Sequence, residues 1–334
     1  MNIVYDALYG DHLRDIGHPE SPDRVEVVAA RLAQRGLIGD FSRPRDAADA
    51  EIERVHEHAY VELVKREIGD LDGPRYLSTG DVVVDARTLD VARRAAGGAV
   101  AAVESSAQRN APVFALVRPP GHHAESARGM GFCVFNNAAI AARAYQAQFG
   151  GRVLLIDFDY HHGNGSQDAV GAGLSYVSTH ASPAYPGTGH EIGVVGEDAL
   201  INVPLPASGI ATEAFVAIWE HLLDRAARFV RPDVIVASAG FDYVAGDPVG
   251  DLGVDVGAAS ALARAINATA QQYCSGRVAY VLEGGYDIDA LTESVAQVIG
   301  VTDRGETQSS GASAQAIPPR QREMLRAIDE HFAR

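Results

Sequence analysis

Cysteine is nearly absent from this chain, whose 334 residues include only Cys133 and Cys274. Two cysteines so far apart cannot form the disulfide framework of a small secreted protein, and their scarcity suits a reducing compartment. The N-terminal segment also lacks a basic stretch followed by a long apolar run, which argues against a signal peptide. No segment approaches the ~20 consecutive apolar residues of a membrane span. We therefore expect a cytoplasmic protein that does not associate with membranes.

Basic residues are also in deficit, with 28 Lys and Arg against 44 Asp and Glu and a formal net charge of -16. This balance argues against binding to nucleic acid, which normally requires a basic patch. An acidic surface can attract cationic substrates, but many proteins are acidic for solubility alone. The hydrophobic content of 47% allows the chain to bury a sizeable core.

Short apolar runs alternate with Ala-rich segments along the chain. The runs are typical of strands covered on both faces, as in a parallel sheet, and they span residues 2–5, 112–117, 152–159, 174–180, 233–240 and 277–285. The Ala-rich segments carry apolar residues three and four apart and predict helices at 88–107, 136–149, 212–230 and 257–273. The alternation predicts an α/β domain with an open, mostly parallel sheet.

No internal repeat and no central linker divides the chain, so we expect a single domain over residues 1–334. The Ser, Gly, Ala and Gln content of 303–319 predicts an exposed loop. The last segment, 320–334, predicts a C-terminal helix from Arg320 to Phe332. That helix would pack on the body of the domain or on another subunit, so a homo-oligomer is an open alternative.

Residues that bind protons or metals gather where the predicted strands end. Five loops with this character follow five of the strands, and they read RPPGHHAESARGMGFCVFNN, DFDYHHGNG, ASPAYPGTGHE, FDYVAGDPVGDL and EGGYD. Ligands in open α/β sheets bind outside the carboxyl ends of the strands. We therefore expect the five loops to converge on one crevice.

A metal site is predicted around Asp159 and His161, which are two residues apart and project to the same side of an extended segment. Asp247, from the AGDP segment, would complete an Asp, His, Asp set that leaves room for water, as in catalytic zinc sites. Asp157 shares the parity of Asp159 and would support the ligands from behind. The alternative, in which Asp159 and His161 only cap a helix, is disfavoured by the other four loops. Such an open site also suits Fe²⁺ or Co²⁺.

His122 and His123 are candidates for acid–base catalysis in the PPGHHA loop. Beside an activated water, one imidazole can take the proton and pass it to a leaving amine. Tyr286, after two glycines, can donate a hydrogen bond to a developing oxyanion. Taken alone, adjacent histidines are more typical of a protein surface than of a catalytic site. Tyr286, taken alone, would be read as an ordinary tyrosine at an interface.

Six motifs in this order resemble the histone deacetylase superfamily, and they read RPPGHHA, GFCVFNNAAIAA, DFDYHHGNGSQD, YPGTG, AGFDYVAGDPVGDL and LEGGYD. The chain is most similar to the class II-like branch of bacterial histone-deacetylase-like amidohydrolases and acetylpolyamine amidohydrolases. The N-terminal HPESPDRVEVV also resembles that branch, and the resemblance covers about residues 1–300. It implies a single arginase-like α/β domain with an eight-stranded, mostly parallel sheet and helices on both faces.

The resemblance also implies a role for each matching residue. The zinc ligands are matched by Asp159, His161 and Asp247, and the catalytic groups by His123 as general base and acid, His122 as its electrostatic neighbour and Tyr286 as the group that polarises the scissile carbonyl. The partners of the histidine pair are matched by Asp157 and Asn164. Asp157, with backbone groups near Ser178, resembles a structural potassium site.

A narrow tunnel for an acylated alkylamine is implied in the same way. Its walls are matched by Gly131, Phe132 and Tyr185, and its rim by Asp81, which would grip the substrate backbone. The expected activity is that of a zinc-dependent deacetylase, which hydrolyses the linear amide of acetyl-lysine or of a related N-acylated alkylamine. The expected partner is an acetylated peptide, an acetylated protein or a small acylated amine.

Three alternative functions compete with this expectation. Relatives selective for acetylated polyamines can carry Glu seven residues after the last ligand, and counting from Asp247 gives Val254 here, which argues against that specificity. An acid from another loop, such as Glu125 or Glu191, leaves it open. A catalytically silent protein that binds acylated ligands has no need of a general base, and an arginase-type ureohydrolase would need a two-metal cluster.

Overall fold

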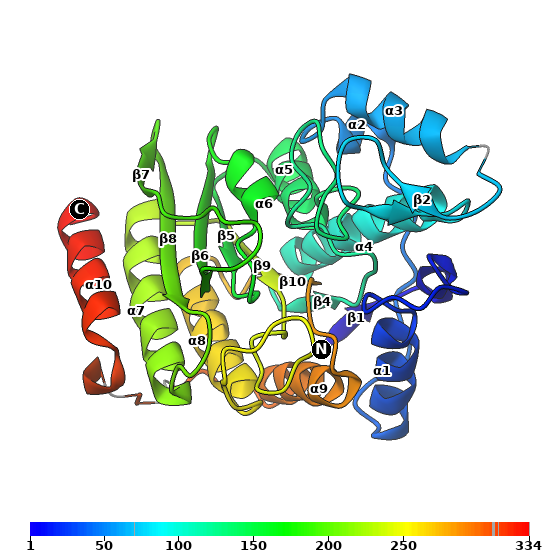
Figure 1. Ribbon diagram of the computed structural model, residues 1–334. Helices are drawn as coiled ribbons and strands as arrows, with labels where there is room; N and C mark the ends of the chain where they lie inside the picture. The colour runs from blue at the N-terminus through cyan, green and yellow to red at the C-terminus, as the bar shows by residue number, and fades with distance from the viewer. Residues whose placement is uncertain (70, 309–310, 313, 334) are drawn as a thin grey trace.

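The computed structural model of the protein describes residues 1–69, 71–308, 311–312 and 314–333. Its centre is an eight-stranded sheet in the order β1-β4-β10-β9-β5-β6-β8-β7 (Figure 1). The strands are β1 (Asn2–Val4), β4 (Val113–Ala115), β5 (Val153–Asp157), β6 (Leu174–Ser182), β7 (Ile192–Val195), β8 (Asp198–Pro206), β9 (Val234–Ala239) and β10 (Val278–Leu282). All neighbours pair in parallel except β7 and β8. The predicted α/β fold with a mostly parallel, eight-stranded sheet is confirmed.

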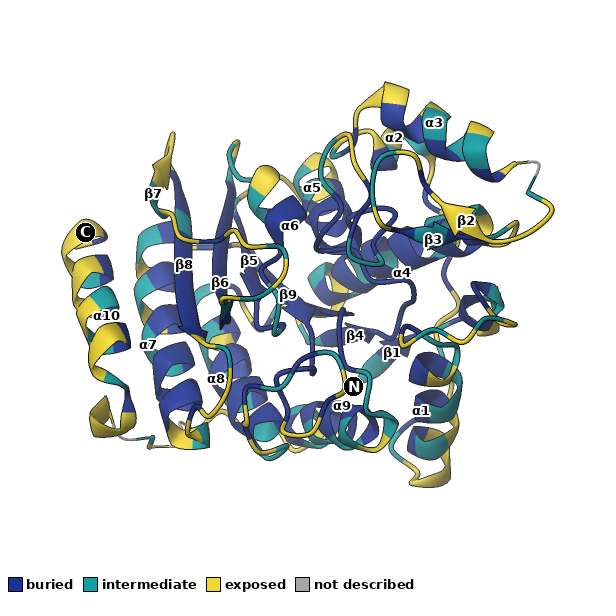
Figure 2. Cartoon of the chain, in the orientation of Figure 1, coloured by how far each residue is buried: buried dark blue, intermediate teal, exposed yellow. Residues whose placement is uncertain are grey.

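Helices cover both faces of the sheet, so that its central strands are buried from either side (Figure 2). On one face, α4 (Thr88–Arg109) and α5 (Asn137–Phe149) pack against the strands. The opposite layer consists of α1 (Asp23–Gln34), α7 (Thr212–Val230), α8 (Ala258–Tyr273) and α9 (Ile288–Asp303). The last helix, α10 (Pro319–His331), contacts α7 and β8, and the Gln321 amide donates to the carbonyl of Pro204. Ala-rich faces let these helices approach the strands closely.

A smaller apolar cluster holds an N-terminal lobe against α4 and α5. The lobe contains α2 (Asp49–Ile52), α3 (His58–Ile68) and a hairpin of β2 (Arg75–Tyr76) and β3 (Val83–Val84). Figure 1 shows it at the side of the molecule that carries α4. The hairpin turn between β2 and β3 carries Asp81. Short segments complete the fold: η1 (Ala7–Asp11), α6 (Asn164–Asp168) and η2 (Ala314–Ala316).

The C-terminal region is more structured than a plain loop and helix. α9 extends to Asp303, η2 lies within the segment expected to be a loop, and α10 begins at Pro319. Residues 309–310, 313 and 334 of the expected loop and helix lie outside the described residues. Within the described residues, no helix has the length and apolar character needed to cross a bilayer.

His56 makes stability depend on pH. It is buried, its Nδ1 lies 2.9 Å from the Glu125 carbonyl, and its Nε2 accepts the Asn136 amide at the start of α5. Burial lowers the pKa of His56 from 6.5 to about 4. As the pH falls below 6.5, the unfolded chain therefore takes up this proton first, and the contribution of His56 to the free energy of unfolding, about 3 kcal/mol, is lost between pH 6.5 and 4.

Chemical denaturation at several pH values tests this expectation. The free energy of unfolding should fall less steeply between pH 6.5 and 4 in His56→Gln than in the parent protein, because the amide can donate and accept without titrating. Equal slopes in the two proteins would contradict the assignment.

Candidate active site

Four adjacent strands deliver the reactive side chains to one edge of the sheet. The neighbours β4, β10, β9 and β5 run in parallel, so their carboxyl ends lie together. The segments that follow them carry the histidine pair, Tyr286, Asp242 and the Asp159 to His161 segment, respectively. Four of the five loops expected to converge therefore do so here, and the fifth, which follows β6, contributes Tyr185 to the cavity described below.

A cluster of three possible metal ligands forms where β5 and β9 end. The ligand atoms of Asp159, His161 and Asp242 all lie within 4.8 Å of one another. The Nδ1 atom of His161 is 3.2 Å from Asp159 Oδ1 and 3.0 Å from Asp242 Oδ2. Burial and the Asp159 carboxylate raise the pKa of Asp242 to about 7. Two buried carboxylates beside one imidazole nitrogen carry excess negative charge, and this donor set fits a divalent cation such as Zn²⁺.

Asp247 does not belong to this cluster, and the sequence-based choice of the third ligand was wrong. Both oxygens of Asp247 face backbone amides: Oδ1 accepts from Val249 and Gly250, and Oδ2 accepts from Tyr286 and Asp287 at 2.6 and 3.0 Å. A carboxylate that accepts four amide hydrogen bonds is committed to holding two loops together. Asp242, which lies shortly after the end of β9, occupies the position of the third ligand that the sequence analysis assigned to Asp247.

The change of the third ligand from Asp247 to Asp242 also corrects the residue expected at the cavity mouth, which was Val254. This residue is fully buried and pairs with Val244 in an isolated bridge, away from the mouth of the site. Counting seven residues from Asp242 gives Val249, which does line the cavity. The seventh residue after the third ligand is therefore a valine whether the count starts at Asp247 or at Asp242, but the valine that lines the cavity is Val249.

The two histidines have different partners. The Nδ1 atom of His122 lies 3.1 Å from Asp157 Oδ2, whereas the Nδ1 atom of His123 lies 2.9 Å from Asn164 Oδ1. Asp157 also accepts from the Tyr176 hydroxyl and from the Asp159 amide. The pairings expected for Asp157 and Asn164 are thus present, one through a carboxylate and the other through an amide.

These partners separate the charge states of the two rings. Burial alone would lower the pKa of His122, but the carboxylates of Asp159 and Asp157 outweigh it and raise the pKa to about 10. Burial and the nearby His122 and His161 lower the pKa of His123 well below its usual range. His123 is therefore the neutral imidazole, and its Nε2 lone pair is available to accept a proton.

Tyr286 is held by residues that are distant in the sequence. The guanidinium of Arg24 lies 4.7 Å from the centre of the Tyr286 ring, and its Nε donates to the Gly285 carbonyl at 2.7 Å. Arg24 also donates to the carbonyl of Glu283 and pairs with Glu20 at 3.0 Å. Burial raises the pKa of the Tyr286 hydroxyl well above its usual value, so the group stays protonated and can donate a hydrogen bond.

A cavity of about 320 Å³ leads to these groups. It is lined by Asp81, His123, Gly131, Phe132, His161, Tyr185, Val249 and Tyr286. Gly131 has φ +55°, and a Cβ there would lie 2.3 Å from the His123 ring, so no other residue fits. Phe132, which also lines the cavity, has a positive φ of 70°, a strained conformation for a bulky side chain. The expected tunnel walls are brought together.

Asp81 organises the mouth of the cavity. Its carboxylate accepts from the Gly131 amide at 2.9 Å and from the Tyr185 hydroxyl at 3.1 Å. Among the described residues, neither Glu125 nor Glu191 lines the cavity. The Glu125 carboxylate accepts a hydrogen bond from the Asn164 side-chain amide, and the Glu191 carboxylate accepts one from the His190 backbone amide.

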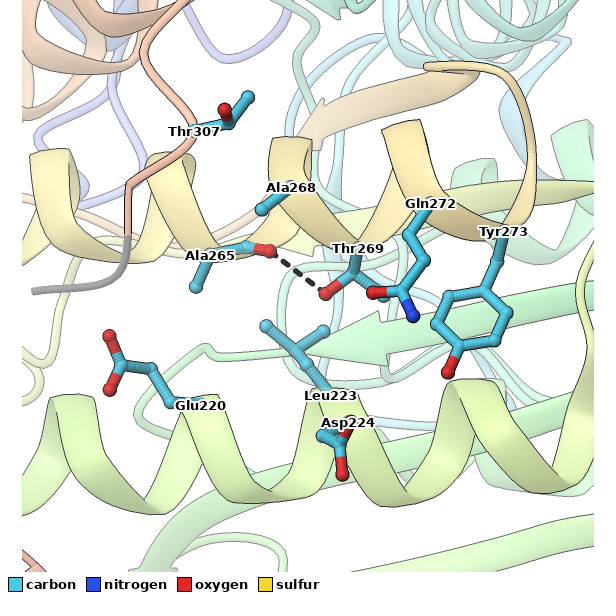
Figure 3. Close-up of a pocket in the computed structure, with 9 residues that line it drawn as sticks. All are labelled: Glu220, Leu223, Asp224, Ala265, Ala268, Thr269, Gln272, Tyr273 and Thr307. Atoms are coloured by element: carbon cyan, nitrogen blue, oxygen red, sulfur yellow. Dashed lines mark hydrogen bonds between the residues drawn. The ribbon is translucent and has the colours of Figure 1, made fainter.

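A second cavity, of about 220 Å³, lies between α7 and α8 and has none of this chemistry (Figure 3). Its described lining contains no histidine or cysteine. The Thr269 hydroxyl donates to the Ala265 carbonyl, and Asp224 accepts from Arg228. Two of its polar side chains are thus engaged within the helices, and its described lining lacks the histidines found at the strand ends.

Several contributors to the site were not identified from the sequence, among them Arg24, which holds the turn of Tyr286. Asp242 and Val249 lie in the same loop as Asp247, and the AGFDYVAGDP segment offers two aspartates between which spacing does not decide. Glu283 is fully buried, and its carboxylate accepts from the Gly121 and His122 amides. The sequence feature that could have identified Glu283 is its position directly before the Gly-Gly-Tyr turn.

Comparison with known proteins places this geometry in a family. The histone deacetylase domain matches residues 18–302. Histone deacetylase 14, chloroplastic, from Arabidopsis thaliana is 36% identical over 84% of this chain and 71% of its own length. A probable deacetylase from Archaeoglobus fulgidus is 31% identical over 86% of this chain and 81% of its own length.

A solved structure agrees with these relatives. The crystal structure of the HDA15 HD domain superposes with a TM-score of 0.86 at 31% identity, over 99% of this chain and 96% of that one. The matched region contains the residues assigned to the site above, from Glu20 to Asp287, and membership supports a deacetylase activity. The chain belongs to the histone deacetylase family.

Proposed function

We propose that this protein is a metal-dependent amidohydrolase that removes the acetyl group from acetyl-lysine in peptides or proteins, releasing acetate and the free amine. The observation that carries the proposal is the juxtaposition of Asp159, His161 and Asp242 with the neutral His123 at the end of the cavity. A cavity with aromatic walls suits the apolar stem of an acylated lysine. The reactive groups lie where its amide would arrive.

The three ligands would hold Zn²⁺, and Fe²⁺ or Co²⁺ would suit the same donors. When bound, such an ion supplies the Lewis acidity that polarises an amide carbonyl and increases the acidity of water. The Asp159 carboxylate accepts the Gly284 amide at 2.7 Å, and Asp242 accepts the Tyr160 amide at 2.9 Å. These backbone contacts orient the ligands without using a side chain that would compete for them.

His123 would act as the general base and then as the general acid. Its Nδ1 is engaged by Asn164, so Nε2 takes the proton from the attacking water and later returns it to the departing amine nitrogen. Tyr286 would donate its hydroxyl hydrogen to the carbonyl oxygen as negative charge develops there. Phe132 and Tyr185 would flank the alkyl chain and exclude bulk water.

Specificity for a peptide is supported by the mouth of the cavity. Val249 offers no charge to a distal ammonium, whereas Asp81 is fixed by Gly131 and Tyr185 where it can accept a backbone amide of a peptide. A small polyamine has no backbone amide to offer. Acetylpolyamine hydrolysis is the second candidate. The net negative charge of the chain and the carboxylate of Asp81 favour it, because both attract a cationic amine.

The test is acetate release by the zinc-loaded protein from an acetyl-lysine peptide and from N-acetylputrescine, compared by kcat/KM. We expect the peptide to be preferred by at least ~10-fold, the effect of one good charge-assisted contact at Asp81. A preference for N-acetylputrescine would replace the peptide assignment by the polyamine one. Release of acetate from neither substrate would contradict the proposed activity.

Three further expectations stay predictions. A structural potassium ion is expected at Asp157 and Ser178, which are register partners on β5 and β6. The cytoplasmic location and the homo-oligomer expected from the sequence also stay open to experiment.

A further inference from the structure

A chain of three side chains runs away from the catalytic cavity behind His123. The Nδ1 atom of His123 lies 2.9 Å from Asn164 Oδ1, and the Nδ2 atom of Asn164 lies 2.7 Å from Glu125 Oε1. The carboxylate of Glu125 is thus two hydrogen bonds from the imidazole. Nothing in the reaction described above assigns Glu125 a role.

The amide in the middle of this chain has two chemically different ends. An asparagine can present either its oxygen or its NH₂ group to a neighbour, and the two orientations have nearly the same shape. If the oxygen faces His123, Nδ1 must carry the proton and Nε2 is free to act as a base. If the NH₂ group faces His123, Nδ1 must accept, the proton moves to Nε2, and the ring can no longer take a proton at the cavity.

Glu125 removes this ambiguity. A carboxylate can only accept hydrogen bonds, so Asn164 must turn its NH₂ group toward Glu125 and its oxygen toward His123. The contact at 2.7 Å is short, as expected when one partner is charged. The two other contacts of the same NH₂ group, to the His123 carbonyl and to Met130 Sδ, are longer at 3.3 Å each.

The backbone of Glu125 is itself fixed. Its amide donates to the Arg128 carbonyl at 2.9 Å, and its carbonyl accepts from the buried His56 at the same distance. Residues 125 and 128 form an isolated antiparallel bridge. The carboxylate therefore leaves a rigid turn, as a group that orients another side chain needs to.

The other histidine shows why an intermediate is needed. His122 contacts the Asp157 carboxylate directly, and a direct carboxylate stabilises a protonated ring. An amide between Glu125 and His123 transmits direction without placing a full charge on the ring. The two histidines can then share one loop and hold different charge states.

We propose that Glu125 is a positioning residue that fixes the amide of Asn164, so that His123 keeps its proton on Nδ1 and presents a free Nε2 to the substrate. This inference rests on the proposed function for its effect on turnover. Its effect on the His123 tautomer does not depend on any substrate.

The main test is the isosteric variant Glu125→Gln. The new side chain has the same size but can donate as well as accept, so the contact at position 125 no longer selects one orientation of Asn164. In ¹⁵N spectra of histidine-labelled, zinc-loaded protein, the His123 signals should change from the Nδ1-protonated pattern to a mixture of the two tautomers. The kcat for the acetyl-lysine peptide should fall about fivefold with KM nearly unchanged, following the fraction of competent His123.

A second substitution should reverse the defect. In the combined variant Glu125→Gln and Asn164→Asp, the carboxylate at position 164 can only accept, and it accepts from both neighbours. His123 should therefore keep a proton on Nδ1 in place of the tautomer mixture of Glu125→Gln, because position 164 again offers Nδ1 only an acceptor, an outcome that loss of packing alone does not produce. Ser126→Ala is the matched control, because Ser126 shares the turn but has only backbone contacts in the chain described.

A His123 spectrum that stays entirely Nδ1-protonated in Glu125→Gln would overturn the proposal, whatever the activity. A tautomer mixture in the combined variant would overturn it as well. If the parent protein releases no acetate, the proposed function fails, but the spectra still decide whether Glu125 sets the tautomer.

Discussion

Replacement of Asp242 by alanine is expected to abolish stoichiometric binding of zinc and to lower kcat/KM by at least ~1000-fold, since several kcal/mol of charge stabilisation are lost with the metal. The reason is the geometry at the ends of β5 and β9, where His161 Nδ1 lies 3.0 Å from Asp242 and 3.2 Å from Asp159. Removing one carboxylate leaves a two-ligand site. Metal content after equilibrium dialysis, measured by atomic emission, tests the assignment separately from activity.

Asp247→Asn is the matched control for this prediction. Its carboxylate holds the Tyr286 and Asp287 amides, and an asparagine would present an NH₂ group to donors that need an acceptor. We expect this variant to keep one zinc per chain while its kcat falls, because the turn that carries Tyr286 loosens. Loss of zinc from Asp247→Asn together with full zinc in Asp242→Ala would reverse the ligand assignment.

The fold was largely predictable, and the missing strands have a physical explanation. Six strands could be recognised because they are short, apolar runs between helices. β8 was missed because Pro204 and Pro206 interrupt its apolar pattern, and proline argues against a strand interior. The strand tolerates them near its end, where Pro204 pairs with His180 and its carbonyl accepts Gln321. β7 is a short antiparallel edge strand with two exposed valines, a pattern that resembles a loop.

The functional site was predictable where the argument depended on strand ends, and less so within a loop. His122, His123, Asp159, His161 and Tyr286 each follow a recognisable strand closely, so topology alone brings them together. Asp242 and Asp247 follow the same strand, and the choice between them depends on where the loop turns. The folded structure, not the spacing, determines that the Asp247 carboxylate accepts backbone amides. The resemblance transferred the ligand to the wrong aspartate, and the error also displaced Val249 to Val254.

The charged side chains that hold the site from distant parts of the sequence could not be predicted, for a different reason. Arg24 lies 261 residues from the Gly285 carbonyl to which it donates. Its burial is compensated by Glu20, which also pairs with the buried Arg118 at 2.7 Å. Such a network has no local pattern, because each charge is explained only by partners from distant segments. The N-terminal segment that resembles the family thus serves to hold the turn of Tyr286.

Tyr286→Phe is expected to lower kcat by at least ~100-fold with a small change in KM, the scale of losing one donor to an oxyanion. The hydroxyl lies on a turn held by Asp247 and Arg24, and burial keeps it protonated well above its usual pKa. Its loss should therefore be felt in the transition state more than in binding. Steady-state kinetics on the acetyl-lysine peptide measure both constants.

Tyr185→Phe separates this role from a general effect of tyrosine in the cavity. The Tyr185 hydroxyl donates to Asp81 at the mouth, so its removal should raise KM through a looser rim and leave kcat within about threefold. Both variants retain an aromatic ring and should keep their zinc. If Tyr286→Phe retained the parental kcat, the developing charge would have to be stabilised without that hydroxyl. The four-strand convergence would then supply the ligands and the base, but not the oxyanion donor.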